Sequence, residues 1–135
     1  MLCTLVWAQA DLDKRRDIAL QRYGLPTADL VDQWRHMIVQ MKALPDSEKL
    51  VMANDFFNTH TLWVEDREAW GQKDYWATPL ETMGNGKGDC EDFAIAKYAM
   101  LILSGVKVDK LRITYVKAQI GDANGKTHAA HMVLA

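Results

Sequence analysis

The sequence predicts an α+β domain in which helices come first and a central helix packs against a small antiparallel sheet. Three observations support this prediction. Helical patterns occupy much of the first hundred residues, a helix is predicted over residues 89–103 with a single charged side chain beyond its first turn, and two extended segments separated by a glycine-containing turn follow it. Because the connection between these two segments is too short for a crossover, they are expected to pair as antiparallel strands.

The first half of the chain is interpreted as three helices and a short extended piece. Residues 11–23 are charged and compatible with a helix, and Thr27 is expected to cap a second helix over residues 28–44. A third helix is expected over residues 46–58, capped by the residue at 46 or 47, and residues 61–64 are a brief extended segment. The residues expected to face inward from the third helix are Leu50, Val51, Ala53, Asn54 and Phe57.

Residues 84–103 organise the rest of the chain. Three of the five residues from 84 to 88 are glycines, which predicts a tight loop with backbone angles that other residues resist. A short helix over residues 79–83 leads into this loop. Asp89 is a good N-cap for the central helix, and Gly105 suits the position that follows its last turn.

Cys90 lies at the start of the central helix. Backbone N–H groups and the positive end of the helix dipole stabilise a thiolate there and are expected to lower the pKa of the cysteine. Many thiol hydrolases present their nucleophile in this way, behind a loop that lets another chain approach closely. An inert buried cysteine is the commoner state for this residue type, so the nucleophile remains a hypothesis that needs a base.

A histidine base would have to come from elsewhere in the fold. Residues 111–118 form the best predicted strand, residues 121–125 a hairpin-type turn, and residues 127–135 a second strand that carries His131 among apolar neighbours. A lone histidine in such a setting is usually a core residue. Its place after the Cys90 helix makes a Cys90–His131 dyad a hypothesis. The remaining histidines, which have weaker claims, are His36, His60 and His128.

Composition excludes some classes of partner. The 135 residues are 49% hydrophobic and 25% charged, as in ordinary globular domains, and carry a net charge of −2. The sequence therefore lacks the basic footprint of a nucleic-acid-binding protein. No apolar run approaches the roughly 20 residues of a membrane span, so no membrane insertion of the mature chain is expected.

The first ten residues are apolar and end in an Ala-x-Ala pattern before a charged segment. This is typical of the end of a secretory signal peptide, although the usual preceding basic residues are missing, and an apolar helical turn is the alternative. We therefore divide the chain into a signal remnant, residues 1–10, and a domain, residues 11–135. Cleavage after Ala10 would remove Cys3 and leave Cys90 as a lone thiol, which an oxidising compartment tolerates poorly unless the thiol is used.

Four segments together resemble the bacterial transglutaminase-like cysteine proteinases of the LapG type. These segments are Tyr75–Glu81, Gly88–Tyr98, Leu111–Ala118 and His131–Ala135, and the run GDCEDFAIAKY around Cys90 is the most specific of them. The resemblance covers residues 44–135 and implies a papain/transglutaminase-like fold. It further implies a calcium-dependent periplasmic endopeptidase that cleaves a large surface adhesin near its N-terminus, at a di-alanine site, and so releases biofilm. An inner-membrane receptor for cyclic di-GMP is the implied controlling partner.

The same resemblance implies roles for individual residues. Cys90 matches the nucleophile and His131 the base, while Asp89 and Glu91 match the calcium-site acids and Asp92 is a candidate further ligand. Carboxylates beside Cys90 oppose thiolate formation, and a bound Ca²⁺ would reverse the local field. Without the resemblance, Glu91 and Asp92 would be interpreted as residues that stabilise the first helical turn.

The sequence departs from the family pattern in one respect. The family triad ends with an Asp on the strand after the histidine strand, and this chain has no acid beyond His131. We therefore expect either a fragment that lacks its last strands or another group that orients His131. Two further functions share the same residues: transglutaminase-like acyl transfer to an amine, and a non-catalytic calcium-dependent interaction module with an idle cysteine.

Overall fold

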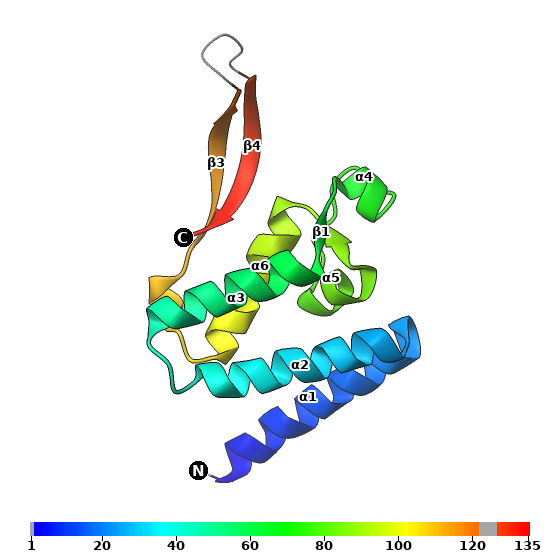
Figure 1. Ribbon diagram of the computed structural model, residues 1–135, viewed down its shortest axis with the longest axis vertical. Helices are drawn as coiled ribbons and strands as arrows, with labels where there is room; N and C mark the ends of the chain where they lie inside the picture. Colours follow the sequence, from blue (N-terminus) through cyan, green and yellow to red (C-terminus); the bar gives the residue numbers. More distant parts are fainter. Residues whose placement is uncertain (1, 122–126) are drawn as a thin grey trace.

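The computed structural model describes the backbone of residues 2–121 and 127–135 (Figure 1). Helices dominate the first part of the chain and a hairpin ends it. The elements in order are α1 (Leu2–Tyr23), α2 (Leu25–Met41), α3 (Asp46–His60), β1 (Leu62–Trp63), α4 (Asp66–Ala69), α5 (Pro79–Asn85), β2 (Lys87–Gly88), α6 (Cys90–Leu103), the 3-10 helix η1 (Val108–Lys110), β3 (Ile113–Ile120) and β4 (Thr127–Leu134). This confirms the predicted α+β class with its helices first.

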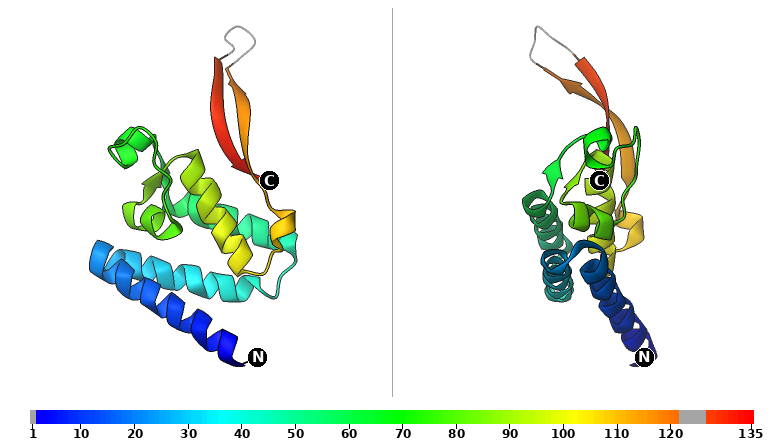
Figure 2. Two further views of the ribbon diagram at one scale, coloured as in Figure 1. Left: turned by 180° about the vertical axis from the view of Figure 1, so that it is seen from behind. Right: turned by 90° about the vertical axis from the view of Figure 1, so that its right-hand side faces the viewer.

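The hydrophobic core lies where α2, α3 and α6 meet. Trp34 of α2, Phe57 of α3 and Met100 of α6 are each at most 1% exposed and belong to one buried cluster. Helix α1 runs antiparallel along α2 on the outside of this body (Figures 1 and 2), and the ion pair between Arg16 and Asp32 joins the two helices at 2.6 Å. The helices thus form the body of the protein, against which the later elements pack.

Helix α2 begins earlier than the sequence suggested. Gly24, with φ of 88°, supplies the turn between α1 and α2, so the helix starts at Leu25 without a side-chain cap. Thr27, predicted as the cap, is instead buried inside the first turn. The helix also ends at Met41, before the predicted residue 44.

The buried face of α3 agrees with the predicted one at Ala53 and Phe57 and differs elsewhere. Lys49, Ala53, Phe56 and Phe57 are buried, which places the stripe at positions i, i+4, i+7 and i+8. The side chains predicted to face inward at the start of the helix are exposed, Leu50 by 47% and Val51 by 59%. Tertiary packing explains the difference. The face of α3 that carries Phe56 and Phe57 packs on α2 and α6, and the neighbouring face, with Leu50 and Val51, lines a cavity.

The predicted glycine loop is shorter than expected because α5 continues through Gly84 to Asn85. A Cβ at Gly84 would lie 2.6 Å from the ring of Tyr23, so this glycine permits close packing of α1 against α5. The turn is made by Gly86, whose φ is 65°, and β2 then pairs in parallel with β1, with Trp63 opposite Gly88. This confirms the brief extended segment predicted at residues 61–64.

Helix α6 and the hairpin agree with their predictions. Asp89 is the N-cap of α6, and Gly105 has a φ of 96° after its C-terminus. Strands β3 and β4 are antiparallel, with Val116 opposite His131 and Tyr115 opposite Met132. Met132, which is 3% exposed, packs the near end of the hairpin onto the helices, while the far end projects away from them (Figures 1 and 2). The predicted turn falls largely on residues 122–126, which lie outside the described residues.

Helix α1 begins at Leu2, so its backbone is continuous across the predicted cleavage point after Ala10. Cleavage at that point stays a prediction. Within the described residues, no helix combines the length and the apolar character that crossing a membrane requires.

Candidate active site

The thiol of Cys90 lies where the N-terminus of α6 meets β4. The backbone N–H of Met132 donates to Cys90 Sγ at 3.4 Å, and the thiol in turn donates to Glu91 Oε2 at 2.9 Å. The strand therefore approaches the helix end closely enough to contact the sulfur itself. This contact fixes the neighbouring residue of β4, His131, beside the cysteine.

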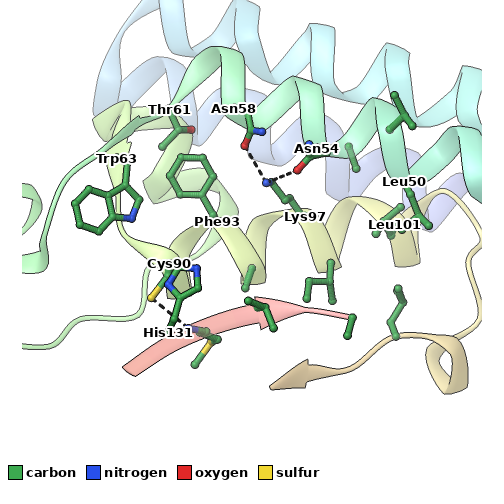
Figure 3. Close-up of a pocket in the computed structure, with 18 residues that line it drawn as sticks. Leu50, Asn54, Asn58, Thr61, Trp63, Cys90, Phe93, Lys97, Leu101 and His131 are labelled. Carbon is green, nitrogen blue, oxygen red and sulfur yellow. Dashed lines mark hydrogen bonds between the residues drawn. The ribbon is translucent and has the colours of Figure 1, made fainter. Parts of the chain in front are cut away.

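His131 and Cys90 line the same cavity, which has a volume of about 820 Å³ and lies between α3, α6 and β4. Figure 3 shows the His131 ring next to the Cys90 side chain at one end of the cavity. Among the described residues, none forms a hydrogen bond with the ring of His131. The predicted dyad residues are thus brought together, while the orienting acid of a Cys-His-Asp triad stays a prediction.

A lysine occupies the middle of the cavity wall. Lys97 Nζ donates to Asn54 Oδ1 at 2.6 Å and to Asn58 Oδ1 at 2.9 Å, and it lies 5.2 Å from the centre of the Phe93 ring (Figure 3). Burial lowers the pKa of Lys97. The two amides pair with the ammonium group. Asn54, which was predicted to face inward, is exposed and lines the cavity instead.

Asp92 anchors the segment before α5 to the start of α6. Its carboxylate is fully buried and accepts hydrogen bonds from Ala77 N at 2.8 Å, Trp70 Nε1 at 3.0 Å and Asp89 N at 3.4 Å. Burial raises the pKa of Asp92, and these donors partly offset the rise. Asp92 therefore has three protein donors and acts in the first place as a structural acid.

The electrostatics of Cys90 differ from the expectation based on the helix dipole. Burial, the hydrogen bond to Glu91 and the charges of Glu91 and Asp89 raise the pKa of the thiol to about 11, and the N–H of Met132 only partly opposes this. The lowered pKa predicted from the helix N-terminus is wrong for the metal-free site, because burial and the adjacent acids outweigh it, the acids as the sequence analysis expected. At neutral pH the cysteine in this state is a thiol.

The pKa values of Asp89 and Glu91, on either side of Cys90, move in opposite directions. Burial, a hydrogen bond with Glu91 and the charges of Glu91, Asp66 and Asp92 raise the pKa of Asp89 to about 8. Burial also favours protonated Glu91, but hydrogen bonds from Cys90 and Asp89 outweigh it and lower the pKa of Glu91. This crowding of carboxylates beside the thiol is the setting that a bound cation would relieve.

Two groups of side chains at the start of α6 have ligand atoms within 4.8 Å of one another. One comprises Asp89, Cys90 and Glu91, and the other comprises Asp66, Asp89 and Asp92. Their carboxylate oxygens are the ligands that Ca²⁺ prefers, so the residues present fit this ion. The three acids predicted from the sequence therefore fall in two groups that share Asp89.

Asp66 is the member of these groups that the sequence analysis missed. It lies far upstream of Asp89, in a segment to which the sequence analysis assigned no helix or strand. The parallel pairing of β1 with β2 brings the residues after each strand to the same edge of the sheet. A two-residue strand leaves too weak a pattern for this pairing to be predicted.

The similarity of this chain to known proteins extends over nearly its whole length. The profile of the bacterial transglutaminase-like cysteine proteinases matches residues 13–135. The chain belongs to this family. Among curated proteins, no match was found. The membership confirms the resemblance carried by the segment around Cys90.

Solved structures of LapG from Legionella pneumophila share the fold. One superposes with a TM-score of 0.73 and 36% identity, covering 91% of this chain and 64% of that one. Its calcium-bound form gives a TM-score of 0.71 and 37% identity, with the same coverages. The EGTA-treated form gives 0.72 and 36%, covering 91% of this chain and 62% of that one. The chain thus spans less than two thirds of the LapG chains and has the predicted transglutaminase-like protease fold.

Proposed function

We propose that this chain carries the nucleophile, the base and the calcium site of a periplasmic cysteine endopeptidase. Its substrate is a large surface adhesin, cleaved near the N-terminus at a di-alanine site to release biofilm, and its regulator is an inner-membrane receptor for cyclic di-GMP. The observation that carries the proposal is the meeting of Cys90 and His131 at one end of a cavity, in a chain of the cysteine proteinase family.

The chemistry follows from the positions of the two side chains. Cys90 Sγ attacks the scissile carbonyl carbon while His131 accepts the thiol proton. His131 then protonates the leaving amine, which leaves the adhesin's new C-terminal carbonyl bonded to sulfur as a thioester. Water, deprotonated by His131, adds to this thioester, and the released thiolate recovers the proton through His131. The net reaction is hydrolysis of one peptide bond.

In the metal-free site, Glu91 competes with His131 for the thiol proton. The Cys90 hydrogen bond goes to Glu91, and both Glu91 and Asp89 oppose the negative charge that develops on sulfur. Asp89 and Glu91 would hold Ca²⁺, and a LapG relative has been solved in a calcium-bound form. When bound, the ion would supply positive charge that offsets these carboxylates and favours the thiolate.

The test is cleavage of a purified N-terminal adhesin fragment with calcium present. Cys90→Ala is expected to abolish cleavage and leave the melting temperature nearly unchanged, because only a partly exposed sulfur is removed. The control is Ser47→Ala, an exposed small side chain outside the cavity, which is expected to cleave at the wild-type rate. Cleavage by Cys90→Ala at a comparable rate would refute the assignment.

The di-alanine site is tested on the substrate side. Replacing both alanines of the fragment with bulky residues is expected to stop cleavage by the wild-type protein, while a replacement several residues away leaves it intact. Mass spectrometry of the products locates the cut. A cut elsewhere would leave the endopeptidase assignment in place and overturn the proposed site preference.

A further inference from the structure

We propose that Asp66 is a ligand of the cation bound beside Cys90, so that the ion joins the segment after β1 to the start of α6. This inference rests on the calcium dependence proposed above and deepens it. It adds a ligand from a distant segment to the acids that flank the cysteine.

One carboxylate oxygen of Asp66 is unsatisfied. Asp66 is 5% exposed, and its Oδ2 accepts a hydrogen bond from Tyr75 N at 2.6 Å. Its Oδ1 is buried and has no hydrogen-bond partner among the described residues. Buried polar atoms are nearly always paired, and an unpaired buried carboxylate is costly. A bound cation would satisfy such an oxygen.

The position of Asp66 also suits a ligand. It offers a carboxylate oxygen within 4.8 Å of oxygens of Asp89 and Asp92. The backbone holds it there, because Val64 N donates to Gly88 O at 3.0 Å in the parallel β1–β2 pair. Within the described part of the chain, no lysine or arginine forms an ion pair with any of these three acids. Three acidic groups around one point, without a compensating cation from the protein, form a site for a hard divalent ion such as Ca²⁺.

Hydrogen bonding distinguishes Asp66 from Asp92. Asp92 already accepts three N–H hydrogen bonds, from Ala77, Trp70 and Asp89. Asp66 accepts one and has a whole oxygen left. The geometry therefore makes Asp66 a ligand together with Asp89, and gives Asp92 the task of holding both segments in place.

The experiment compares Asp66→Asn with the matched control Asp74→Asn. Asparagine is nearly isosteric and keeps an oxygen for Tyr75 N, while Asp74 is an exposed acid in the same segment. Calcium affinity is measured by calorimetry, and the melting temperature is measured in calcium and in EDTA. Terbium, used as a calcium substitute, reports on location because Trp70 beside Asp92 can sensitise its luminescence.

Asp66→Asn is expected to weaken calcium binding by roughly tenfold or more, since affinity depends on the number of charged ligands. Terbium luminescence should fall in parallel. In EDTA its melting temperature should equal or exceed that of wild type, because a carboxylate near Asp89 and Asp92 has been removed. Asp74→Asn should match wild type throughout.

Equal calcium affinity in the two variants would overturn the inference. So would a lower melting temperature of Asp66→Asn in EDTA with unchanged affinity, the result of a purely structural role. A wild-type protein that cleaves adhesin but binds no calcium would also overturn it while leaving the endopeptidase standing. Calcium binding that depends on Asp66, in a protein that does not cleave, would support the inference and refute the proposed function.

Discussion

At the scale of single residues, opposing influences act on the pKa of Cys90. The start of a long helix favours a thiolate, whereas burial, Glu91 and Asp89 favour the thiol and raise its pKa to about 11. Burial and the acids together outweigh the helix N-terminus, and one of the acids accepts the thiol hydrogen bond directly, at 2.9 Å. At neutral pH the thiol is therefore protonated in the metal-free site, and its reactivity should depend on what neutralises the acids.

This conflict predicts how Cys90 reacts with iodoacetamide in a Cys3→Ala background. In EDTA at pH 7 alkylation should be much slower than for a free thiol of pKa ~8.5. The rate should climb with pH toward about 11, since only the thiolate reacts. Calcium should move the profile to lower pH, because a thiol pKa that falls by one makes the thiolate fraction at pH 7 about tenfold larger.

Glu91→Gln is the matched variant for that experiment. It removes the charge that the thiol faces but keeps an amide oxygen, so its EDTA rate at pH 7 should exceed that of wild type, with a smaller response to calcium. A wild-type profile that is identical in calcium and in EDTA would show that the ion does not act through Cys90.

Residues whose roles are local were predictable, and those whose roles are long-range were not. Cys90, Asp89 and Glu91 sit within one helical turn of each other, so their proximity follows from the helix pattern. His131 could be predicted as the base because it lies on an apolar strand that follows the cysteine helix. Asp66 was not found, because its position depends on a pairing between two two-residue strands.

At the scale of elements, the junction between β2 and α6 decides the geometry of the site. Gly88 ends β2, Asp89 caps α6, and Asp92 folds back so that its Oδ2 accepts from Asp89 N. A Cβ at Gly88 would lie 2.7 Å from Asp92 Oδ2 and 2.8 Å from Asp92 Cβ. The glycine is therefore required by close packing against Asp92, whereas Gly86 is required by its backbone angle.

Gly88→Ala is expected to destabilise the protein by about 1–3 kcal/mol, the usual cost of an overpacked buried site. It should also weaken calcium binding, because Asp92 cannot move without loosening Ala77 and Trp70. The control is Gly86→Asn. A side chain at position 86 would meet open space, and asparagine tolerates a positive φ, so this variant should lose little stability. Chemical denaturation of both variants measures the difference, and equal stabilities would contradict the packing argument.

The boundaries of other elements show where sequence patterns fail. The N-terminus of α2 was misplaced because Gly24 makes the turn through its backbone and leaves no side-chain cap to recognise. The inward face of α3 was misassigned because Leu50, Val51, Phe56 and Phe57 allow two adjacent apolar faces. Only the packing of α3 against α6 selects between them.

At the scale of the whole molecule, the site joins segments that lie far apart along the chain. The α1–α2 pair supports α5 through Tyr23 and Gly84, α5 leads through β2 to α6, and the hairpin reaches α6 through Met132. The acids beside Cys90 lie at the start of α6, where these segments meet. A cation there would therefore stabilise the fold as a whole, in proportion to RT ln(1 + [Ca²⁺]/Kd).

The pH and calcium together should set the stability of the fold. Asp89 has a pKa of about 8 when folded, against an ordinary value of 3.8, so between these values the folded protein holds the extra proton. Stability in EDTA should therefore be highest near the lower end of this window and fall as pH rises from about 5 to 8. Asp92, whose pKa is also raised, acts in the same direction, while Glu91, whose pKa is lowered, acts at more acidic pH.

Calcium should reverse this trend, because its ligands must be deprotonated and the proton on Asp89 is displaced on binding. The increase in melting temperature caused by calcium should thus be larger at pH 8 than at pH 5.5. Asp89→Asn keeps an N-cap acceptor for Glu91 N and removes one titrating group, so it should show a smaller decline in EDTA, with the part due to Asp92 remaining, and a smaller gain in calcium. Melting curves of wild type and Asp89→Asn across this pH range, in EDTA and in calcium, measure both effects. Parallel curves for the two proteins would show that Asp89 links neither protons nor calcium to folding.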